Sequence, residues 1–282
     1  MRKNFGWALA SIVSLGVAGL GAASAADMAV KARPMPAPVA AVYDWTGFYI
    51  GGNAGWVGAV NQNANLTGTD TGGGGFGSEL ADGSTPSVFH QRYNGFIGGG
   101  QVGYNKQIGT WVVGIEADID GASASAASTQ VNLPQPPFPA RSAITTTVSN
   151  KLDYLGTVRG RLGVLVSNPV LLYVTGGLAY GKTELGVSSV CPTCAPARNL
   201  ATVSGATNFG WTIGAGAEWM FAPNWSAKVE YLYYDLGTNT TAPLVYTYGA
   251  STSTLIASMK ETGQLARVGV NYHFGAPVVA RY

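Results

Sequence analysis

The chain is poor in charged side chains, because Asp, Glu, Lys and Arg together make up only 11% of its 282 residues. The surface of a soluble domain usually carries about 25–35% charged residues. Yet beyond the N-terminal segment no stretch offers the roughly 20 apolar residues of a membrane helix, and the nearest candidate, 162–180, is interrupted by Ser167-Asn168-Pro169. Low charge combined with 40 Gly and 14 Tyr therefore favours a β-barrel in lipid.

The N-terminus has the pattern of a secretory signal peptide. Two basic residues precede an apolar stretch over 5–22, and Ala23-Ser24-Ala25 is a small-x-small cleavage pattern. An uncleaved anchor is the alternative, which the Gly-rich apolar stretch and the adjacent cleavage pattern disfavour. We expect a signal peptide over 1–25, a Pro/Ala-rich periplasmic linker over 26–43 and one barrel over 44–282. The mature chain carries 14 basic and 14 acidic side chains, which gives no indication of nucleic-acid binding.

Alternation with a period of two marks eight strands. They are expected at 46–57, 95–106, 110–120, 151–166, 170–183, 206–221, 224–236 and 262–274. The connections alternate between long and short, and the long ones are polar and of low complexity, so we expect them to be structureless. This rhythm predicts an all-β fold: an eight-stranded antiparallel up-and-down transmembrane β-barrel with four long outer loops and short periplasmic turns.

Charged residues on these strands share faces with Gly and Thr, opposite faces rich in Val, Ile, Leu and aromatic residues. A Lys or Arg facing lipid at mid-membrane would cost about 2–4 kcal/mol, so the charged faces should point inward. We predict a lumenal ion-pair network of Glu116, Asp118, Arg159, Arg161, Glu218, Lys228, Glu230 and Arg267. A soluble barrel with the opposite orientation would need far more charge on its exterior.

Aromatic residues gather near the strand ends, as in the girdles of membrane barrels. They are Trp45, Phe48, Trp56, Trp111, Trp219, Trp225 and Tyr272. The last strand alternates apolar residues up to Phe274, and the chain ends at Tyr282. The expected signal for membrane insertion therefore consists of Val268, Val270, Tyr272 and Phe274 or Tyr282, with the choice of terminal aromatic left open.

Several motifs together resemble a known family. The segments 45–56 (WTGFYIGGNAGW), 153–163 (DYLGTVRGRLG), 229–237 (VEYLYYDLG) and 267–274 (RVGVNYHF) are similar to strands of the small outer-membrane β-barrel surface antigens of alphaproteobacteria, of the Brucella and rhizobial type. That family is related to the OmpA-type membrane domain. The resemblance implies an abundant eight-stranded barrel in the outer membrane of a Gram-negative bacterium, with envelope and surface roles and no catalytic residues.

Motifs that could carry chemistry have simpler explanations. Gly98–Gly103 matches G-x-G-x-x-G, but it lies inside an expected strand and not before a helix, so it does not indicate a dinucleotide site. Cys191 and Cys194 lie in an expected outer loop of an exported chain, which favours a disulfide over free thiols. His90 and His273 are expected at opposite ends of the barrel, too far apart for one catalytic site. We expect no enzyme activity, no cofactor and no metal.

The leading functional hypothesis is therefore a structural barrel that contributes to envelope integrity and exposes its loops at the cell surface. Two alternatives stay open: a binding protein whose loops recognise a host surface, haem or another ligand, and a small diffusion pore. The expected partners are outer-membrane lipid, the barrel-assembly machinery during insertion, and a host or surface ligand of the outer loops.

Overall fold

The computed structural model describes residues 43–132 and 142–274. The expected signal peptide, the linker up to residue 42, and Tyr282 lie outside these residues. The described residues contain no helix long and apolar enough to cross a membrane.

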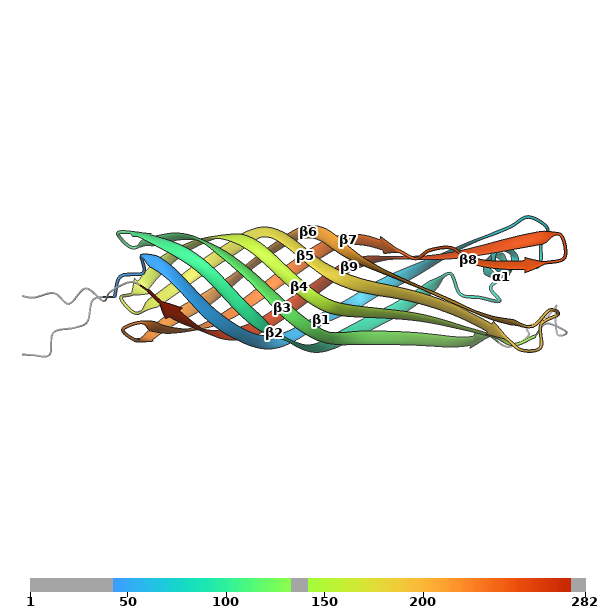
Figure 1. Ribbon diagram of the computed structural model, residues 1–282, viewed down its shortest axis with the longest axis horizontal. Helices are drawn as coiled ribbons and strands as arrows, with labels where there is room; N and C mark the ends of the chain where they lie inside the picture. Colours follow the sequence, from blue (N-terminus) through green and yellow to red (C-terminus); the bar gives the residue numbers. More distant parts are fainter. Residues whose placement is uncertain (1–42, 133–141, 275–282) are drawn as a thin grey trace, which may run out of the picture. The chain divides into compact units, whose positions relative to one another are not determined.

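One antiparallel sheet forms the body of the protein. Its elements are β1 Gly47–Asp70, α1 Phe76–Ala81, β2 Val88–Ile108, β3 Trp111–Asn132, β4 Ile144–Ser167, β5 Val170–Cys191, β6 Arg198–Ala222, β7 Trp225–Thr240, β8 Leu244–Tyr248 and β9 Ser251–His273. Each strand from β1 to β6 pairs with the next, β7 pairs with β9, and β9 pairs back with β1. These eight strands close a barrel (Figure 1), which confirms the predicted fold class.

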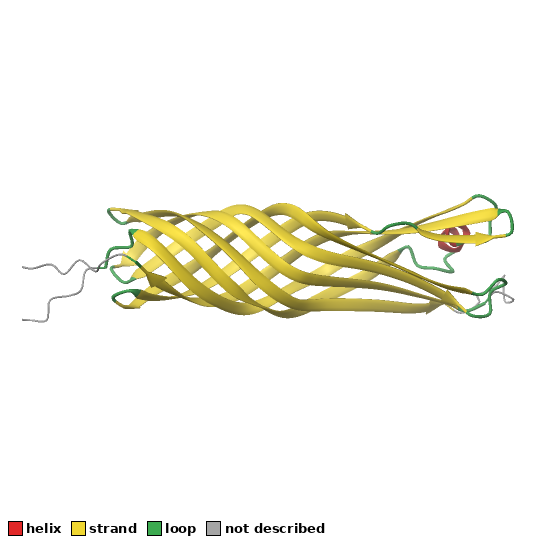
Figure 2. Ribbon diagram, in the orientation of Figure 1, coloured by secondary structure: helices red, strands yellow, loops and turns green. Residues whose placement is uncertain are grey.

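Short turns join β2 to β3, β4 to β5 and β6 to β7, so this end of the barrel is the periplasmic one. At the opposite end the structure differs from the expectation of structureless loops. The strands continue well past their predicted ends, and the short strand β8 and the helix α1 lie there as well (Figure 2). Backbone pairing thus continues through segments that we expected to be loop.

Two belts of outward-facing aromatic side chains bound the lipid-facing band. Phe48, Trp111, Trp219, Trp225 and Tyr272 form the periplasmic belt, and Trp56, Phe96, Phe209 and Trp211 form the outer belt. We call the barrel between them the membrane section and the strands beyond the outer belt the outer section. Trp45 does not belong to a belt as predicted: its side chain is fully buried and its ring meets His273 edge-on inside the periplasmic end.

The two sections have opposite polarity. In the membrane section most inward side chains are polar or charged, apart from a small apolar cluster at the periplasmic end that includes Trp45, Val112 and Met220. The outer section instead holds two larger apolar clusters in its interior. The inner apolar cluster includes Val57, Tyr93, Leu152, Tyr234 and Leu265. The outer apolar cluster includes Ala64, Phe76, Phe89, Val148 and Met259. Water surrounds the outer section, so its apolar residues are buried inside, as in a soluble barrel.

A change of register explains one further difference. Unbroken alternation along the expected strand 151–166 would place Leu152 on the lipid-facing side with Tyr154, but Leu152 is 1% exposed and belongs to the inner apolar cluster. The pairing of β4 with β5 shifts between Leu152 and Tyr154. Such an irregularity moves the following side chains to the opposite face.

Candidate functional site: the lumen of the barrel

The lumen of the membrane section is filled by charged side chains from five strands. They are Glu116 and Asp118 on β3, Arg159 and Arg161 on β4, Glu218 on β6, Lys228 and Glu230 on β7, and Arg267 on β9, all buried. Alternate positions of a strand point to the same side, so neighbouring strands bring these groups to similar levels. Glu116 lies opposite Arg159, Glu218 opposite Lys228, and Glu230 opposite Arg267.

Two arginines connect the acids of β3 with the acid of β7. Arg159 donates to Glu116 at 2.5 Å, to Asp118 at 2.8 Å and to Glu230 at 3.0 Å. Arg267 donates to Glu230 and to Asp118, both at 2.8 Å. Since both guanidinium groups share two carboxylates, the charges form one continuous network across the barrel.

The network extends towards the periplasmic end through Arg161 and Lys228. Arg161 donates to Glu218 at 2.6 Å and its guanidinium lies 3.9 Å from the centre of the Tyr173 ring. The Lys228 ammonium lies 2.9 Å from both carboxylate oxygens of Glu116. The structure therefore brings all eight predicted residues together.

Several members of the network were not predicted. Asp120 accepts a hydrogen bond from Arg267 at 2.6 Å. The Tyr49 hydroxyl donates to Glu116 at 2.8 Å and accepts from Arg161 at the same distance. Asp120 could have been found from the sequence, because it continues the alternation of Glu116 and Asp118 by one more step. Tyr49 could not, because the alternation alone gives no indication that an aromatic residue faces inward.

Glycines make room for the bulky lumenal side chains. A side chain on Gly103 would collide with the ring of Tyr49, and one on Gly216 would collide with Tyr173. The G-x-G-x-x-G match at 98–103 lies inside β2, and its last glycine serves this packing.

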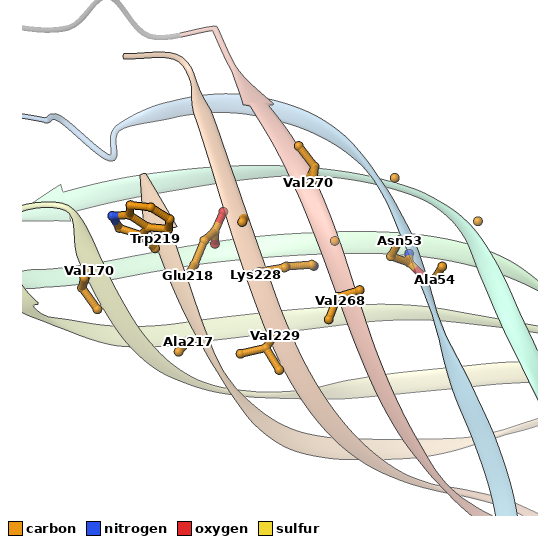
Figure 3. A pocket seen from close by; sticks show the side chains of 14 residues that line it. Asn53, Ala54, Val170, Ala217, Glu218, Trp219, Lys228, Val229, Val268 and Val270 are labelled. Carbon is orange, nitrogen blue, oxygen red and sulfur yellow. The ribbon is translucent and has the colours of Figure 1, made fainter. Parts of the chain in front are cut away.

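The outward face of the same strands is apolar. Figure 3 shows the wall made by β6, β7, β9 and β1, where Val229, Val268 and Val270 line a shallow pocket. These valines alternate along the chain with the buried Lys228 and Arg267. In the predicted insertion signal, Val268, Val270, Tyr272 and Phe274 all face outward and are at least 36% exposed.

The outer end of the barrel holds α1. Arg198 on β6 makes two hydrogen bonds to the carboxylate of Glu79, at 2.9 and 3.0 Å, and lies over the Phe76 ring. Asp70 accepts hydrogen bonds from the backbone N–H groups of Gly77 and Ser78 at the start of α1. Burial raises the pKa of Asp70, but hydrogen bonds from Ser253, Ser78 and Gly77 outweigh it and lower the pKa to about 2.

The cysteines and histidines lie apart from the lumenal network or at its edge. Cys191 and Cys194 form a disulfide at the tip that joins β5 to β6. His90 faces outward on β2 and contacts Asn63, whereas His273 lies inside the periplasmic end, 2.9 Å from Ser226. Among the described residues no three His, Cys, Asp or Glu side chains are grouped to hold a metal ion.

A closed barrel with a charged interior, an apolar outer band and two aromatic belts defines a transmembrane β-barrel of the bacterial outer membrane. The comparisons with known proteins identify the family. Residues 15–274 match the model of the outer membrane protein beta-barrel domain. The chain belongs to that family and is a protein of the Gram-negative outer membrane.

Relatives of the predicted type support this assignment. The chain is 34% identical over 270 residues to a 31 kDa outer-membrane immunogenic protein of Brucella melitensis, covering 94% of this chain and 99% of that protein. It is 32% identical over 201 residues to a 22 kDa outer membrane protein of Rhizobium leguminosarum, covering 71% of this chain and 68% of that one. A solved structure, the outer membrane protein OprG of Pseudomonas aeruginosa, matches with a TM-score of 0.44 and 10% identity over 83% of this chain and 99% of that chain.

Proposed function

We propose that this protein is a structural barrel with a closed lumen, which contributes to envelope integrity and carries a folded outer section at the cell surface. The ion-pair network of the membrane section supports this function most directly. Its carboxylates, guanidinium groups and ammonium group bond to one another across the whole lumen. An eight-stranded barrel has room inside for packed side chains and little else.

A diffusion pore is the alternative that this geometry disfavours. An ion crossing the lumen would have to separate Arg159 and Arg267 from four carboxylates that lie within 3.0 Å of one or both of them. Separating buried charges is costly because no solvent replaces the lost partner. The same crowding leaves no room for a substrate within the described part of the lumen, which supports a non-enzymatic role.

Planar-bilayer conductance of the refolded mature protein tests the closed lumen, with folding verified by a heat-dependent gel shift. We expect well-folded wild-type protein to be silent. The double variant Arg159→Ala/Arg161→Ala should lose stability, and any barrel that still folds should conduct. Lys151→Ala, an exposed cation on the same strand, is the matched control and should stay silent. Steady channels from the wild-type protein would contradict the proposal.

Presentation of the outer section is supported by its length and its polarity. After Trp56, β1 continues for 14 residues to Asp70, which at roughly 3.3 Å per residue is a strand length of about 45 Å. On β2 the outward residues there are His90, Arg92 and Asn94. The Brucella relative is named an immunogenic protein, and a protruding polar surface of this kind is what an antibody or a host ligand would contact.

Complementation of a deletion strain separates the envelope role from loop binding. A variant with Cys191→Ser and Cys194→Ser changes only the tip between β5 and β6. If the role is structural, this variant should restore detergent resistance as fully as the wild type. Loss of binding to a host surface with intact resistance would instead support recognition by the loops.

Insertion into the membrane by the assembly machinery should depend on the outward residues of β9, including Val268 and Val270.

A further inference from the structure

A polar layer lies between the two apolar clusters of the outer section. Its main members are Gln62 on β1, Gln91 on β2, Asn150 on β4 and Glu261 on β9, and each is at most 4% exposed. The next inward-facing residues along β2 show that this layer lies between the two clusters. On β2, Gln91 lies between Phe89 of the outer cluster and Tyr93 of the inner cluster.

The contacts of this layer hold its members close together. Gln62 and Gln91 are directly paired across β1 and β2. Asn150 Nδ2 donates to Glu261 Oε2 at 3.3 Å, across the barrel interior. Gln62 Nε2 donates to the carbonyl of Thr262, next to Glu261, and Gln91 Nε2 donates to the carbonyl of Val148 at 3.0 Å. Four strands therefore contribute to one level.

These donor contacts also fix which way each amide points. Each of the three NH2 groups bonds to an oxygen, so exchanging N and O in any of them would put two acceptors in contact. The amide oxygens consequently have assigned positions. Gln62 Oε1, Gln91 Oε1, Asn150 Oδ1 and Glu261 Oε1 are all buried, and none of them has a hydrogen-bond partner among the described residues. All four atoms are acceptors.

The layer also holds an uncompensated acid. Glu261 forms no ion pair within the described residues, in contrast to every carboxylate of the lumenal network, and Lys260 beside it faces outward to Asp235. The polar groups on its periplasmic side are the hydroxyls of Tyr93 and Tyr234, which bond to each other at 2.8 Å. A buried carboxylate between apolar clusters requires a counter-charge or a proton.

We infer that Glu261, Gln62, Gln91 and Asn150 form a binding site for one hard metal cation with oxygen ligands. Carboxylate oxygens and the carbonyl oxygens of Asn and Gln are the ligands that such cations use in proteins. A cation would satisfy all four oxygens and the charge together. A proton on Glu261 would satisfy that atom and one amide oxygen and leave two amides without a donor. Water would supply hydrogens but no charge.

The site lies inside a folded barrel, so the test loads it during folding. The mature protein is unfolded, stripped of metal with a chelator, and refolded in choline, sodium, potassium or calcium chloride at equal ionic strength. Ligand binding to the folded state raises the unfolding midpoint in proportion to the logarithm of ligand concentration. We expect at least one metal salt to raise the midpoint above that in choline, and the midpoint to keep rising with the logarithm of that metal's concentration.

Glu261→Gln removes the charge with little change of shape and should abolish the metal dependence. Glu184→Gln is the matched control, because Glu184 is a more exposed acid on β5 that pairs with Lys182, and it should keep the wild-type response. If Glu261→Gln does not fold, Gln91→Met removes one oxygen ligand and should shift the response to higher metal concentration.

Three outcomes would overturn the inference: equal wild-type midpoints in all four salts, a metal effect that persists in Glu261→Gln, or a midpoint that depends on pH but not on the cation. The last outcome would assign a proton to Glu261.

Discussion

Replacing Arg267 tests whether the lumenal network holds the barrel together. Arg267 contacts Asp118, Asp120 and Glu230 at 2.6 to 2.8 Å, and its side chain has no solvent exposure. Arg267→Met keeps most of the side-chain volume but leaves three acids with one partner fewer. Removing one partner of a buried ion pair costs about 3–5 kcal/mol. Because Asp120 loses its only charged partner among the described residues, we expect the upper part of that range.

The measurement is the free energy of unfolding in denaturant, followed by tryptophan fluorescence in lipid vesicles. Lys260→Met on the same strand is the control, because Lys260 is exposed and its pair with Asp235 is a surface pair, which contributes little to stability. Adding Asp120→Asn to Arg267→Met should recover part of the loss by removing one unpaired charge. An Arg267→Met protein within about 1 kcal/mol of the wild type would refute the reasoning.

Three further predictions concern α1, its contact with β6, and the outward faces of the membrane and outer sections. The pKa of Asp70 is lowered to about 2 from its ordinary 3.8. Its stabilisation of α1 should therefore be full above about pH 4 and lost as the pH falls through about 2. Protection of the Ser78 amide from hydrogen exchange, followed against pH, measures this loss. Arg198→Met should make residues 71–87 sensitive to protease on whole cells, while the barrel stays folded by gel shift. Val268→Lys should cost about 2–4 kcal/mol of unfolding free energy because it faces lipid, whereas Asn94→Lys in the outer section should cost almost nothing.

The membrane section could be predicted from the sequence because there a single rule applies to every strand. On β2, Val102 and Tyr104 face lipid while Gln101 and Asn105 face the lumen. Nearer the outer end of β2 the side chains still alternate between the same two sides, but the polarity of the sides is reversed. The outward residues there are the polar His90 and Arg92, and the inward ones are the apolar Phe89 and Tyr93. The expected strand begins only at residue 95, next to this reversal of polarity. The reversal marks the level at which the surroundings change from lipid to water.

The eight charged residues of the lumen could be predicted because a charged side chain in a lipid-spanning strand must point into the lumen and not into the lipid. The neutral members were not predictable in this way. Gln101 and Asn271 bond to each other at 2.7 Å inside the lumen. A neutral amide that faces lipid costs less free energy than a charge does, so the sequence alone does not determine which way it faces. The layer around Glu261 was missed for another reason: the expected strands 46–57, 95–106, 151–166 and 262–274 all stop short of this level, so its four residues were assigned to loops.

The division into two sections determines where this protein can meet a partner. Inside the membrane section ion pairs cross the lumen, and above it two apolar clusters and α1 lie in the interior. A ligand that entered from outside would have to displace Phe76 and the Glu79–Arg198 pair before it reached any cavity. Recognition through the exterior of the outer section requires no such cost, because its outward residues are already solvated. Under the proposed function, the strands would support a water-facing surface away from the membrane, and the lumenal ion pairs would stabilise those strands.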